Sequence, residues 1–397
     1  GLGDVYKRQT KDSYTIETVD GKKVERKPHV LDIDPNAASK VTYEFYMLKE
    51  IDEQPSVMRK ISQTYFDENS DVKVEPQIID ALSKADRIYI YAAGTSYHAG
   101  LVGKTLLEHY TGIPTEVGLA SEAGYHFPMM SKKPFFIFLT QSGETADSRV
   151  VLKEVNKRNI PSLTITNVEG STLSREADYT MLLEAGPEIA VASTKAYTAQ
   201  IAVQAVLAKA LGEALNNQDA KDWNLKHDLA IAAEGMQQLV DSKESLKEIA
   251  DKYLIKSRNA FYIGRGIDYA VALEGALKLK EVSYIQTEGF AAAELKHGTI
   301  SLIEKGTPVI ALINDPATAD LTRGNIQEVV SRGANIITIV GKDFAREGDD
   351  IVLPEINYYM SALLTVVPAQ LLAYYASKDK GLDVDKPRNL AKSVTVE

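Results

Sequence analysis

Two loops rich in hydroxyl side chains are the first candidates for chemistry in this sequence. The loop 141–145 (QSGET) follows an apolar run that ends at Thr140, and the loop 94–96 (GTS) follows another such run. Each loop precedes a predicted helix, whose free N–H groups and positive dipole end attract phosphate. Thr140, Ser142 and Thr145 can add side-chain donors. Because both loops lie at the carboxyl ends of predicted parallel strands, we expect them to meet in one crevice.

An ordinary helix N-cap is the alternative interpretation of the loop 141–145. The hydroxyl of Ser142 would then accept a hydrogen bond from the backbone N–H of Thr145. Glu144 is an awkward neighbour for an anion and would have to point away from the site.

A third segment, 191–195 (VASTK), leads into a predicted helix from Ala196. Ser193 or Thr194 is the expected N-cap of that helix. Lys195 is expected to be a solvated surface charge.

The predicted helix 268–285 carries charges on an otherwise apolar surface. Glu274, Lys278 and Glu281 are spaced i, i+4 and i+7, which places them within about 60° of one another around the helix. The stripe is either a structural ion-pair network or a site. Beside a substrate carbonyl, a carboxylate there could carry a proton between adjacent carbons, and the lysine could stabilise an oxyanion.

His297 lies in the last turn of a short predicted helix that Gly298 ends. The negative end of the helix dipole favours imidazolium, and such a histidine suits the opening of a sugar ring. A structural role is the alternative. No histidine pair has metal-ligand spacing, so no metal is expected.

These candidates require strands and helices in a fixed order. From Arg87 onward, short apolar strands alternate with helices, which predicts parallel βαβ units. The pattern then returns, because Gly266 follows Gly94 by 172 residues and Asp320 follows Asp147 by 173. This repeat predicts a duplicated α/β domain.

The second copy lacks the hydroxyl side chains of the first. Ile267-Asp268 stands where the first copy has Thr95-Ser96, and Asp315-Pro316 stands where it has Ser142-Gly143. Carboxylates repel phosphate, so only the first copy is expected to bind it.

The rest of the chain is predicted in less detail. Residues 42–66 are predicted to be helical with a break at Pro55, and residues 226–256 to be helical. The segment 215–224 is the best linker candidate. Asp20-Gly21 separates two short β-branched runs and predicts a hairpin, whereas residues 1–9 fit nothing that follows.

Composition excludes several classes of function. The chain has 397 residues, a formal net charge of −10 and no cysteine. The charge argues against nucleic acid and anionic membranes as partners. The absence of cysteine excludes disulfides, thiolate metal sites and a cysteine nucleophile. No apolar run was expected to span a bilayer, and no signal sequence is evident, so a cytoplasmic location is predicted.

Several motifs together resemble one enzyme family. AAGTSYHAG, TQSGETADS, VASTKAYTAQ, EGALKLKEVSYI, AAAELKHG and DKPRNLAKSVTVE are similar to the isomerase part of the glucosamine-6-phosphate synthase family, over about residues 30–397. The resemblance implies two tandem sugar-isomerase (SIS) domains, each a doubly wound parallel sheet in a three-layer, flavodoxin-like α/β/α fold. It also implies conversion of fructose 6-phosphate, with glutamine-derived ammonia, to glucosamine 6-phosphate, without a cofactor.

The resemblance assigns roles to individual residues. It implies that Glu281 moves the proton between C1 and C2 with Lys278 assisting, that His297 opens the ring from the neighbouring subunit of a homodimer, and that Lys392 forms a Schiff base. Residue types alone do not single out Lys392, because a lysine near a terminus is normally solvated. The implied ligands of the sugar phosphate are Ser96, Thr140, Gln141, Ser142 and Thr145, and those that line the sugar are Thr95, Val191 and Ser193.

The resemblance also gives expected domain boundaries. The divisions are 1–35 with the last hairpin of a glutaminase domain, 36–76 as a helical linker, 77–216 and 257–385 as SIS domains, 217–256 as a helical connector and 386–397 as the tail. The family's glutaminase domain starts with a catalytic cysteine. The chain is therefore expected to be part of a longer enzyme and to have no glutaminase activity itself.

Two other functions remain open on the sequence. One is a stand-alone SIS enzyme that deaminates or isomerises an amino-sugar phosphate. The other is a sugar-phosphate sensor without catalysis, which would leave Glu281 and His297 without a role.

Overall fold

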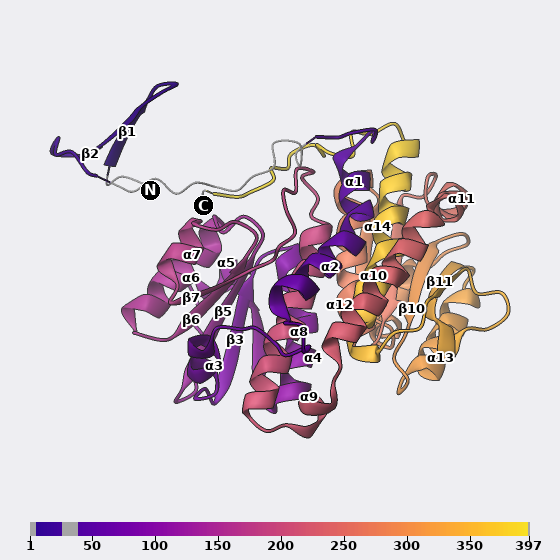
Figure 1. The fold of residues 1–397 in the computed structure, drawn as a ribbon. Helices are drawn as coiled ribbons and strands as arrows, with labels where there is room; N and C mark the ends of the chain where they lie inside the picture. The colour runs from indigo at the N-terminus through magenta and orange to yellow at the C-terminus, as the bar shows by residue number, and fades with distance from the viewer. Residues whose placement is uncertain (1–4, 26–38, 396–397) are drawn as a thin grey trace. The chain divides into compact units, whose positions relative to one another are not determined.

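The computed structural model describes residues 5–25 and 39–395. It divides into two compact units, Gly1–Ser39 and Lys40–Glu397. The larger unit contains two parallel five-stranded sheets with helices packed on their faces (Figure 1).

The first sheet has the strand order β4-β3-β5-β6-β7, and each neighbouring pair is parallel. Along β3, Ile88 and Ile90 point to one face while Tyr89 and Tyr91 point to the other, and all four are buried. Burial on both faces is typical of a parallel sheet covered by helices. The strands are β3 (Arg87–Ala92), β4 (Thr115–Leu119), β5 (Pro134–Thr140), β6 (Ser162–Thr166) and β7 (Tyr179–Leu182).

The second sheet repeats this order, as β9-β8-β10-β11-β12, again with parallel pairs. In both sheets the first strand lies beside the second and third strands of its domain, which is the flavodoxin-like order with a switch point between first and third. The predicted duplication and fold class are thus confirmed. The strands are β8 (Asn259–Gly264), β9 (Gln286–Ala291), β10 (Pro308–Ile313), β11 (Asn335–Gly341) and β12 (Ile351–Leu353).

One loop shows the duplication in backbone angles. Gly94 follows β3 with φ 54° and ψ −128°, and Gly266 follows β8 with φ 55° and ψ −126°. Positive φ with this ψ favours glycine because a Cβ would be strained there. Each glycine therefore turns its chain directly into the following helix, α4 (Thr95–Thr111) or α12 (Ile267–Ser283).

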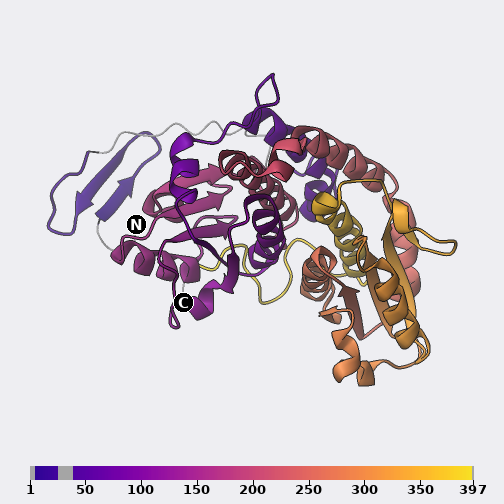
Figure 2. The ribbon, with the colours of Figure 1, turned by 90° about the horizontal axis from the view of Figure 1, so that it is seen from below.

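Helices between the two sheets share a single core. Figures 1 and 2 show the sheets on either side of α4, α8 (Lys195–Ala214), α12 and α14 (Ser361–Asp379). Their apolar residues form one continuous cluster with the inner faces of both sheets and with the helices that precede and connect the sheets. Those other helices are α1 (Tyr46–Asp52), α2 (Gln54–Tyr65), α3 (Pro76–Leu82), α9 (Gln218–Asp222), α10 (Leu225–Asp241) and α11 (Lys243–Tyr253).

The outer face of each sheet has its own smaller cluster. On the first sheet it lies beneath short helices and α6, and on the second beneath α13 and 3-10 turns. These elements are α5 (Ala120–Ala123), α6 (Ala146–Lys157), α7 (Thr172–Glu176), α13 (Ala319–Val330), η1 (Glu294–His297), η2 (Thr299–Leu302) and η3 (Lys342–Phe344). The turn η4 (Tyr358–Met360) instead belongs to the shared core.

The N-terminal unit corrects the predicted hairpin. Strand β1 (Val5–Gln9) pairs antiparallel with β2 (Tyr14–Thr18), so residues 5–9 do have a structural partner. The turn at Asp20-Gly21 forms, with Gly21 at φ 82°, but it leads only to an isolated bridge between Glu17 and Lys23. The rest of the predicted second strand, from residue 26, lies outside the described residues.

Several helix predictions also need correction. The predicted helix 42–66 begins only at Tyr46, whereas its predicted break at Pro55 is confirmed. The helices α1 and α2 meet at Glu53, and Pro55 occupies the first turn of α2, where a missing N–H costs no bond. The linker candidate 215–224 contains α9, which Asn217 caps through a bond from the N–H of Ala220. The predicted helix 226–256 is α10 and α11, separated at Ser242.

One apolar helix is long enough for a membrane span, contrary to the sequence prediction. Residues Tyr358–Asp379 are long and apolar enough to cross a bilayer, but their most apolar stretch is wholly buried inside the protein. A buried core helix can have the same length and composition, and this helix packs against α12 in the shared core.

Candidate active site

A cavity of about 480 Å³ lies where the first domain, the helix α12 and the C-terminal tail meet. It brings together eleven of the twelve candidate residues, and only His297 is not among its lining residues. Those eleven are Thr95, Ser96, Thr140, Gln141, Ser142, Thr145, Val191, Ser193, Lys278, Glu281 and Lys392.

The two hydroxyl loops form one wall of the cavity, at the switch point between β3 and β5. Gly143 N–H donates to Thr140 Oγ1 (3.1 Å), and Thr140 and Thr145 share a hydroxyl hydrogen bond of 3.0 Å. Ser142 Oγ accepts from the N–H of Glu144 (3.1 Å), not from that of Thr145 as the N-cap interpretation required.

Glu144 points away from the loop, as an anion site requires. Its carboxylate accepts from both the N–H and the hydroxyl of Thr172, at 2.8 and 2.7 Å. The negative charge is therefore tied to the start of α7 and does not line the cavity.

The opposite wall carries the charged stripe of α12. Lys278 Nζ lies 2.7 Å from Glu281 Oε2 and donates to Thr95 Oγ1 at 3.1 Å. Burial alone would lower the pKa of Lys278, but the negative charges of Glu281 and Glu274 outweigh it, so the pKa is raised. The lysine is therefore cationic, and it holds the carboxylate of Glu281 at the edge of the cavity.

The C-terminal tail brings Lys392 into the cavity. Its Nζ lies 2.6 Å from Glu188 Oε2, and its side chain keeps a quarter of its surface exposed. The tail is fixed on both sides of this lysine. Val394 O accepts from Ala146 N–H at the start of α6 (3.1 Å), and Asp385 O accepts from Val191 N–H (3.0 Å).

Glu188 is buried and makes four hydrogen bonds. Besides Lys392, it accepts from Ser193 Oγ (2.9 Å) and from the N–H groups of Thr194 and Ala196 at the start of α8 (2.9 and 3.1 Å). Burial would raise the pKa of Glu188, but Lys392 and these bonds lower it. Thr194 is the N-cap residue of α8, one of the two predicted positions, but its side chain makes no capping hydrogen bond, and Glu188 supplies the acceptor instead.

A second carboxyl, Glu50 of α1, lies behind Glu188. Its Oε1 accepts from the N–H groups of Ile189 and Ala190. Burial and the negative charge of Glu188 raise the pKa of Glu50 to about 8. At neutral pH the pair thus consists of one anion and one neutral acid, so Lys392 faces a single full negative charge.

Lys195, expected at the surface, is buried. Its Nζ pairs with Glu53 Oε2 at 2.7 Å, between α8 and the junction of α1 and α2. The sequence interpretation was therefore wrong for this residue.

His297 is exposed on η1 of the second domain and does not reach the cavity of its own chain. The predicted α-helix is a 3-10 turn, which Gly298 ends at φ 140°.

The loop of the second domain that matches the phosphate loops is closed by its own carboxylates. Asp268 is buried and accepts from both Asn314 N–H and Nδ2, each at 2.7 Å. Burial raises the pKa of Asp268 to about 7. A buried acid stands here where the first domain has the hydroxyl of Ser96, and phosphate binding by the first domain alone stays a prediction.

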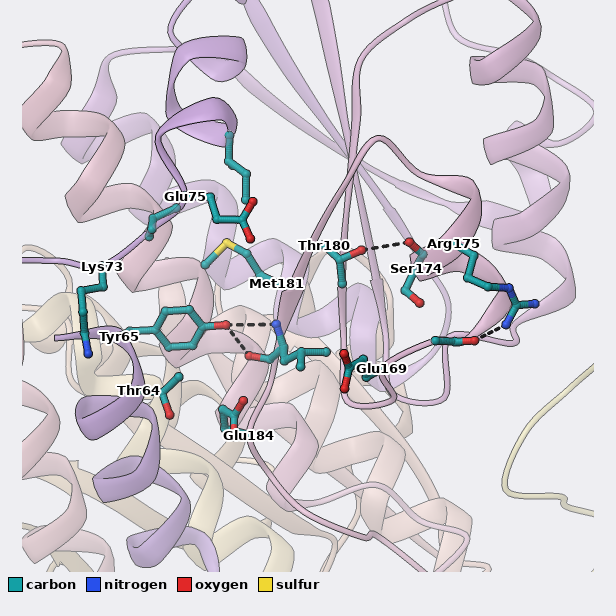
Figure 3. Close-up of a pocket in the computed structure, with 14 residues that line it drawn as sticks. Thr64, Tyr65, Lys73, Glu75, Glu169, Ser174, Arg175, Thr180, Met181 and Glu184 are labelled. Atoms are coloured by element: carbon teal, nitrogen blue, oxygen red, sulfur yellow. Dashed lines mark hydrogen bonds between the residues drawn. The ribbon is translucent and has the colours of Figure 1, made fainter. Parts of the chain in front are cut away.

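A second cavity, of about 530 Å³, is lined by residues of α2, α3 and β7 (Figure 3). Tyr65 crosses it and its hydroxyl binds the backbone of Leu182 on β7. Three carboxylates line it, those of Glu75, Glu169 and Glu184, and none of the candidate residues does. Lys73 and Arg175 also line it, so the cavity contains cations as well as carboxylates.

Metal ligands are not grouped in the described part of the chain. Among residues 5–25 and 39–395, no three histidine or acidic side chains come together as a metal site.

Sequence reasoning missed the residues that act behind the cavity. Glu188 and Glu50 contact the site through segments distant in sequence, and Lys392 lies 204 residues from its partner. The one sequence signal for the capping role of Glu188 was its position, five residues before Ser193 and eight before Ala196, where the helix was predicted to start.

The family of the chain follows from comparison with known proteins. The SIS domain family matches residues 81–210 and 253–377, which cover the two sheets and most of their helices. The chain belongs to the SIS domain family.

Within that family, curated relatives are close in sequence. The chain is 62% identical over 386 residues to glutamine–fructose-6-phosphate aminotransferase [isomerizing] of Lactiplantibacillus plantarum, covering 97% of this chain and 64% of the relative. It is 60% identical over 388 residues to the protein of the same name from Streptococcus agalactiae, covering 98% and 64%. The chain thus spans 64% of the length of these relatives.

Solved structures agree with this placement. The C-terminal domain of glucosamine-fructose-6-phosphate aminotransferase from Francisella tularensis is 34% identical, with a TM-score of 0.82 over 88% of this chain and all of that one. A glucosamine-6-phosphate deaminase from Thermotoga maritima, 24% identical, has a TM-score of 0.71 over 88% and 99% of the two chains. The second similarity supports the fold alone.

Proposed function

We propose that this chain is the isomerase part of a glutamine–fructose-6-phosphate aminotransferase. It takes fructose 6-phosphate from the ketose to the aldose level, and in a longer enzyme ammonia converts the same substrate to glucosamine 6-phosphate with release of water. The relatives of that name support this function, and the cavity supports the site.

The phosphate binds at the two hydroxyl loops. Ser96, Thr140, Gln141, Ser142 and Thr145 surround it from the starts of α4 and α6, where backbone N–H groups and helix dipoles favour an anion. Thr95, Val191 and Ser193 then line the sugar chain between the phosphate and the tail.

Lys392 forms the imine. Its neutral amine attacks the C2 carbonyl of the open ketose, and the carbinolamine loses water to give a C=N bond. The attacking lysine first gives up a proton, and the carboxylate of Glu188 at 2.6 Å is placed to accept it.

Glu281 transfers the proton between carbons. Water, or ammonia in the longer enzyme, first displaces Lys392 from C2, so that the lysine leaves as a free amine. The carboxylate of Glu281 then removes a proton from C1, and the electrons form the C1–C2 double bond and pass to the C2 oxygen or nitrogen, which takes a proton. A proton returns at C2 as the C1 hydroxyl loses its proton and becomes the carbonyl. Lys278 keeps Glu281 oriented and stabilises negative charge that develops on the neighbouring oxygen.

The predicted homodimer completes the site. His297 of each chain is exposed and outside its own cavity, which agrees with a role in opening the ring in the partner's cavity. No nucleic acid or membrane partner is proposed, and the cytoplasmic location stays a prediction.

The observation that carries this proposal is the joint presence of Lys392, Glu281 and the hydroxyl loops in one cavity. Borohydride reduction in the presence of fructose 6-phosphate should attach the sugar to the peptide that contains Lys392. Lys392→Gln should abolish the adduct, while Lys386→Gln, a change of an exposed lysine in the same tail, should keep it. Fructose without phosphate should give far less adduct. Labelling at another lysine would contradict the assignment.

A further inference from the structure

Helix α12 contains a carboxylate that the proposed reaction does not use directly. Glu274 is wholly buried, and both of its oxygens are held from α4 of the first domain. Thr95 Oγ1 donates to Oε1 at 3.1 Å, and His98 Nδ1 lies 2.7 Å from Oε2. The charge of this buried group therefore depends on side chains of the other domain.

Glu274 is connected to the proton-transfer pair through Lys278. Lys278 Nζ lies 3.6 Å from Glu274 Oε1 and 2.7 Å from Glu281 Oε2, and it is itself buried. Thr95 uses its one hydrogen on Glu274 and accepts from Lys278 at 3.1 Å. The ammonium is thus shared between two carboxylates, with the shorter contact to Glu281.

We propose that His98 is a positioning residue for proton transfer: its ring nitrogen holds Glu274 so that Lys278 stays against Glu281. This inference rests on the proposed function. For an anionic Glu274 the contact requires a hydrogen on Nδ1, which donates to Oε2.

Loss of this donor changes the balance around Lys278. An anion with an unsatisfied buried oxygen either takes a proton or draws the nearest cation toward it. The second change moves Lys278 from Glu281 toward Glu274, and the first removes half of the negative charge that keeps Lys278 in place. Both changes displace Glu281, and neither acts on the loop 141–145, whose hydrogen bonds are made with its own neighbours.

The position of His98 gives it a further property. It lies on the first turn of α4, next to Thr95 and Ser96, so the same helix start carries sugar-phosphate ligands and the donor to Glu274. A movement of α4 upon phosphate binding would therefore reach Glu281 through two hydrogen bonds and one ion pair.

Three substitutions separate the hydrogen bond from the bulk of the ring. His98→Asn keeps a donor at about the position of Nδ1, His98→Gln moves the donor to about the position of Nε2, and His98→Leu removes it. His126→Leu, a change of an exposed histidine after α5, is the matched control.

Two readouts are measured for each variant with fructose 6-phosphate. Deuterium incorporation at C1 in deuterated water reports proton transfer, and borohydride trapping at Lys392 reports the earlier imine. We expect exchange to fall about ten- to a hundred-fold in His98→Leu and His98→Gln, as for loss of a hydrogen bond to a charged group, with trapping and the KM of the substrate within about twofold. His98→Asn should retain most of the exchange.

The outcomes distinguish the inference from the proposed function. If the unsubstituted chain shows neither trapping nor exchange, the proposed function fails. If that chain is active and His98→Leu exchanges at its rate, or if His98→Asn loses as much as His98→Leu, the positioning role is wrong. Equal loss of trapping and exchange would indicate a general structural role and would also overturn it.

Discussion

Lys392 and Glu188 form a 2.6 Å ion pair across 204 residues of sequence, and the carboxylate of that pair also caps α8. One buried group therefore fixes both the tail lysine and a core helix. The same carboxylate lies beside the neutral acid Glu50 of α1. The negative charge of Glu188 is therefore the point at which α1, α8 and the tail come together.

Glu188→Gln is expected to release the tail. The amide offers one acceptor oxygen and no charge, so Lys392 loses its counter-ion and α8 loses part of its cap. We expect a loss of about 1–3 kcal/mol in the free energy of unfolding and faster proteolysis between residues 386 and 395. Urea unfolding and limited proteolysis measure both, and an unchanged cleavage rate would contradict the tethering.

Glu50→Gln is expected to change how stability depends on pH. The folded pKa of Glu50 is about 8 and the ordinary value is 4.5, so between these values the folded state keeps a proton that the unfolded state has lost. Stability therefore falls as pH rises through this window, by up to about 1.4 kcal/mol per pH unit. The Glu50→Gln variant has no titrating carboxyl at this position, so it should lose this dependence of stability on pH.

Asp268→Asn should likewise remove a fall in stability with rising pH between about pH 4 and 7, because burial raises the pKa of Asp268 to about 7. Urea unfolding from pH 5 to 8 tests both variants, with the exposed Glu144→Gln as control. Parallel curves for Glu50→Gln and the unsubstituted chain would show that Glu50 is ionised in the fold.

Glu281→Gln is expected to abolish proton transfer but not binding. The amide cannot accept the C1 proton, so deuterium exchange at that carbon should fall at least about 100-fold. Phosphate binding, measured by titration calorimetry with a reduced sugar phosphate, should stay within a few-fold, because the hydroxyl loops are unchanged. Glu288→Gln, an exposed change on β9, is the control. Normal exchange would assign the base to another residue.

Gly94→Ala and Gly266→Ala form a matched pair for the two domains. Both glycines share nearly the same φ and ψ, so both substitutions should destabilise the fold by about 1–3 kcal/mol. Only Gly94 lies at the cavity, so only its substitution should raise the KM for fructose 6-phosphate. A higher KM in both variants would mean that the second loop also contributes to binding.

Mixing two inactive variants tests the dimer. Glu281→Gln and His297→Asn should each be inactive alone, but a mixed dimer contains one cavity with both residues intact. Refolding or exchanging equal amounts should restore about a quarter of the activity. No recovery, with dimers present by light scattering, would place both residues in one chain's site.

The fold could be predicted from sequence because its signals are local and repeated. The Gly94 and Gly266 offset identified the duplication, and the apolar runs identified the strands. The hydroxyl loops were likewise recognisable, since each follows a strand and precedes a helix. The environment of the site could not be predicted. Lys195 resembles a surface charge in the sequence because its partner Glu53 is distant along the chain. Glu188 acquires its role only through its contact with Lys392 of the tail.

The shared core between the two sheets has a consequence for how the protein can be divided. Both domains complete their inner faces only against each other's helices, with α4, α8, α12 and α14 in a single apolar cluster. Cutting the chain near residue 217 would leave each half with a large uncovered apolar face, so we expect neither half to fold alone and both to regain structure when mixed.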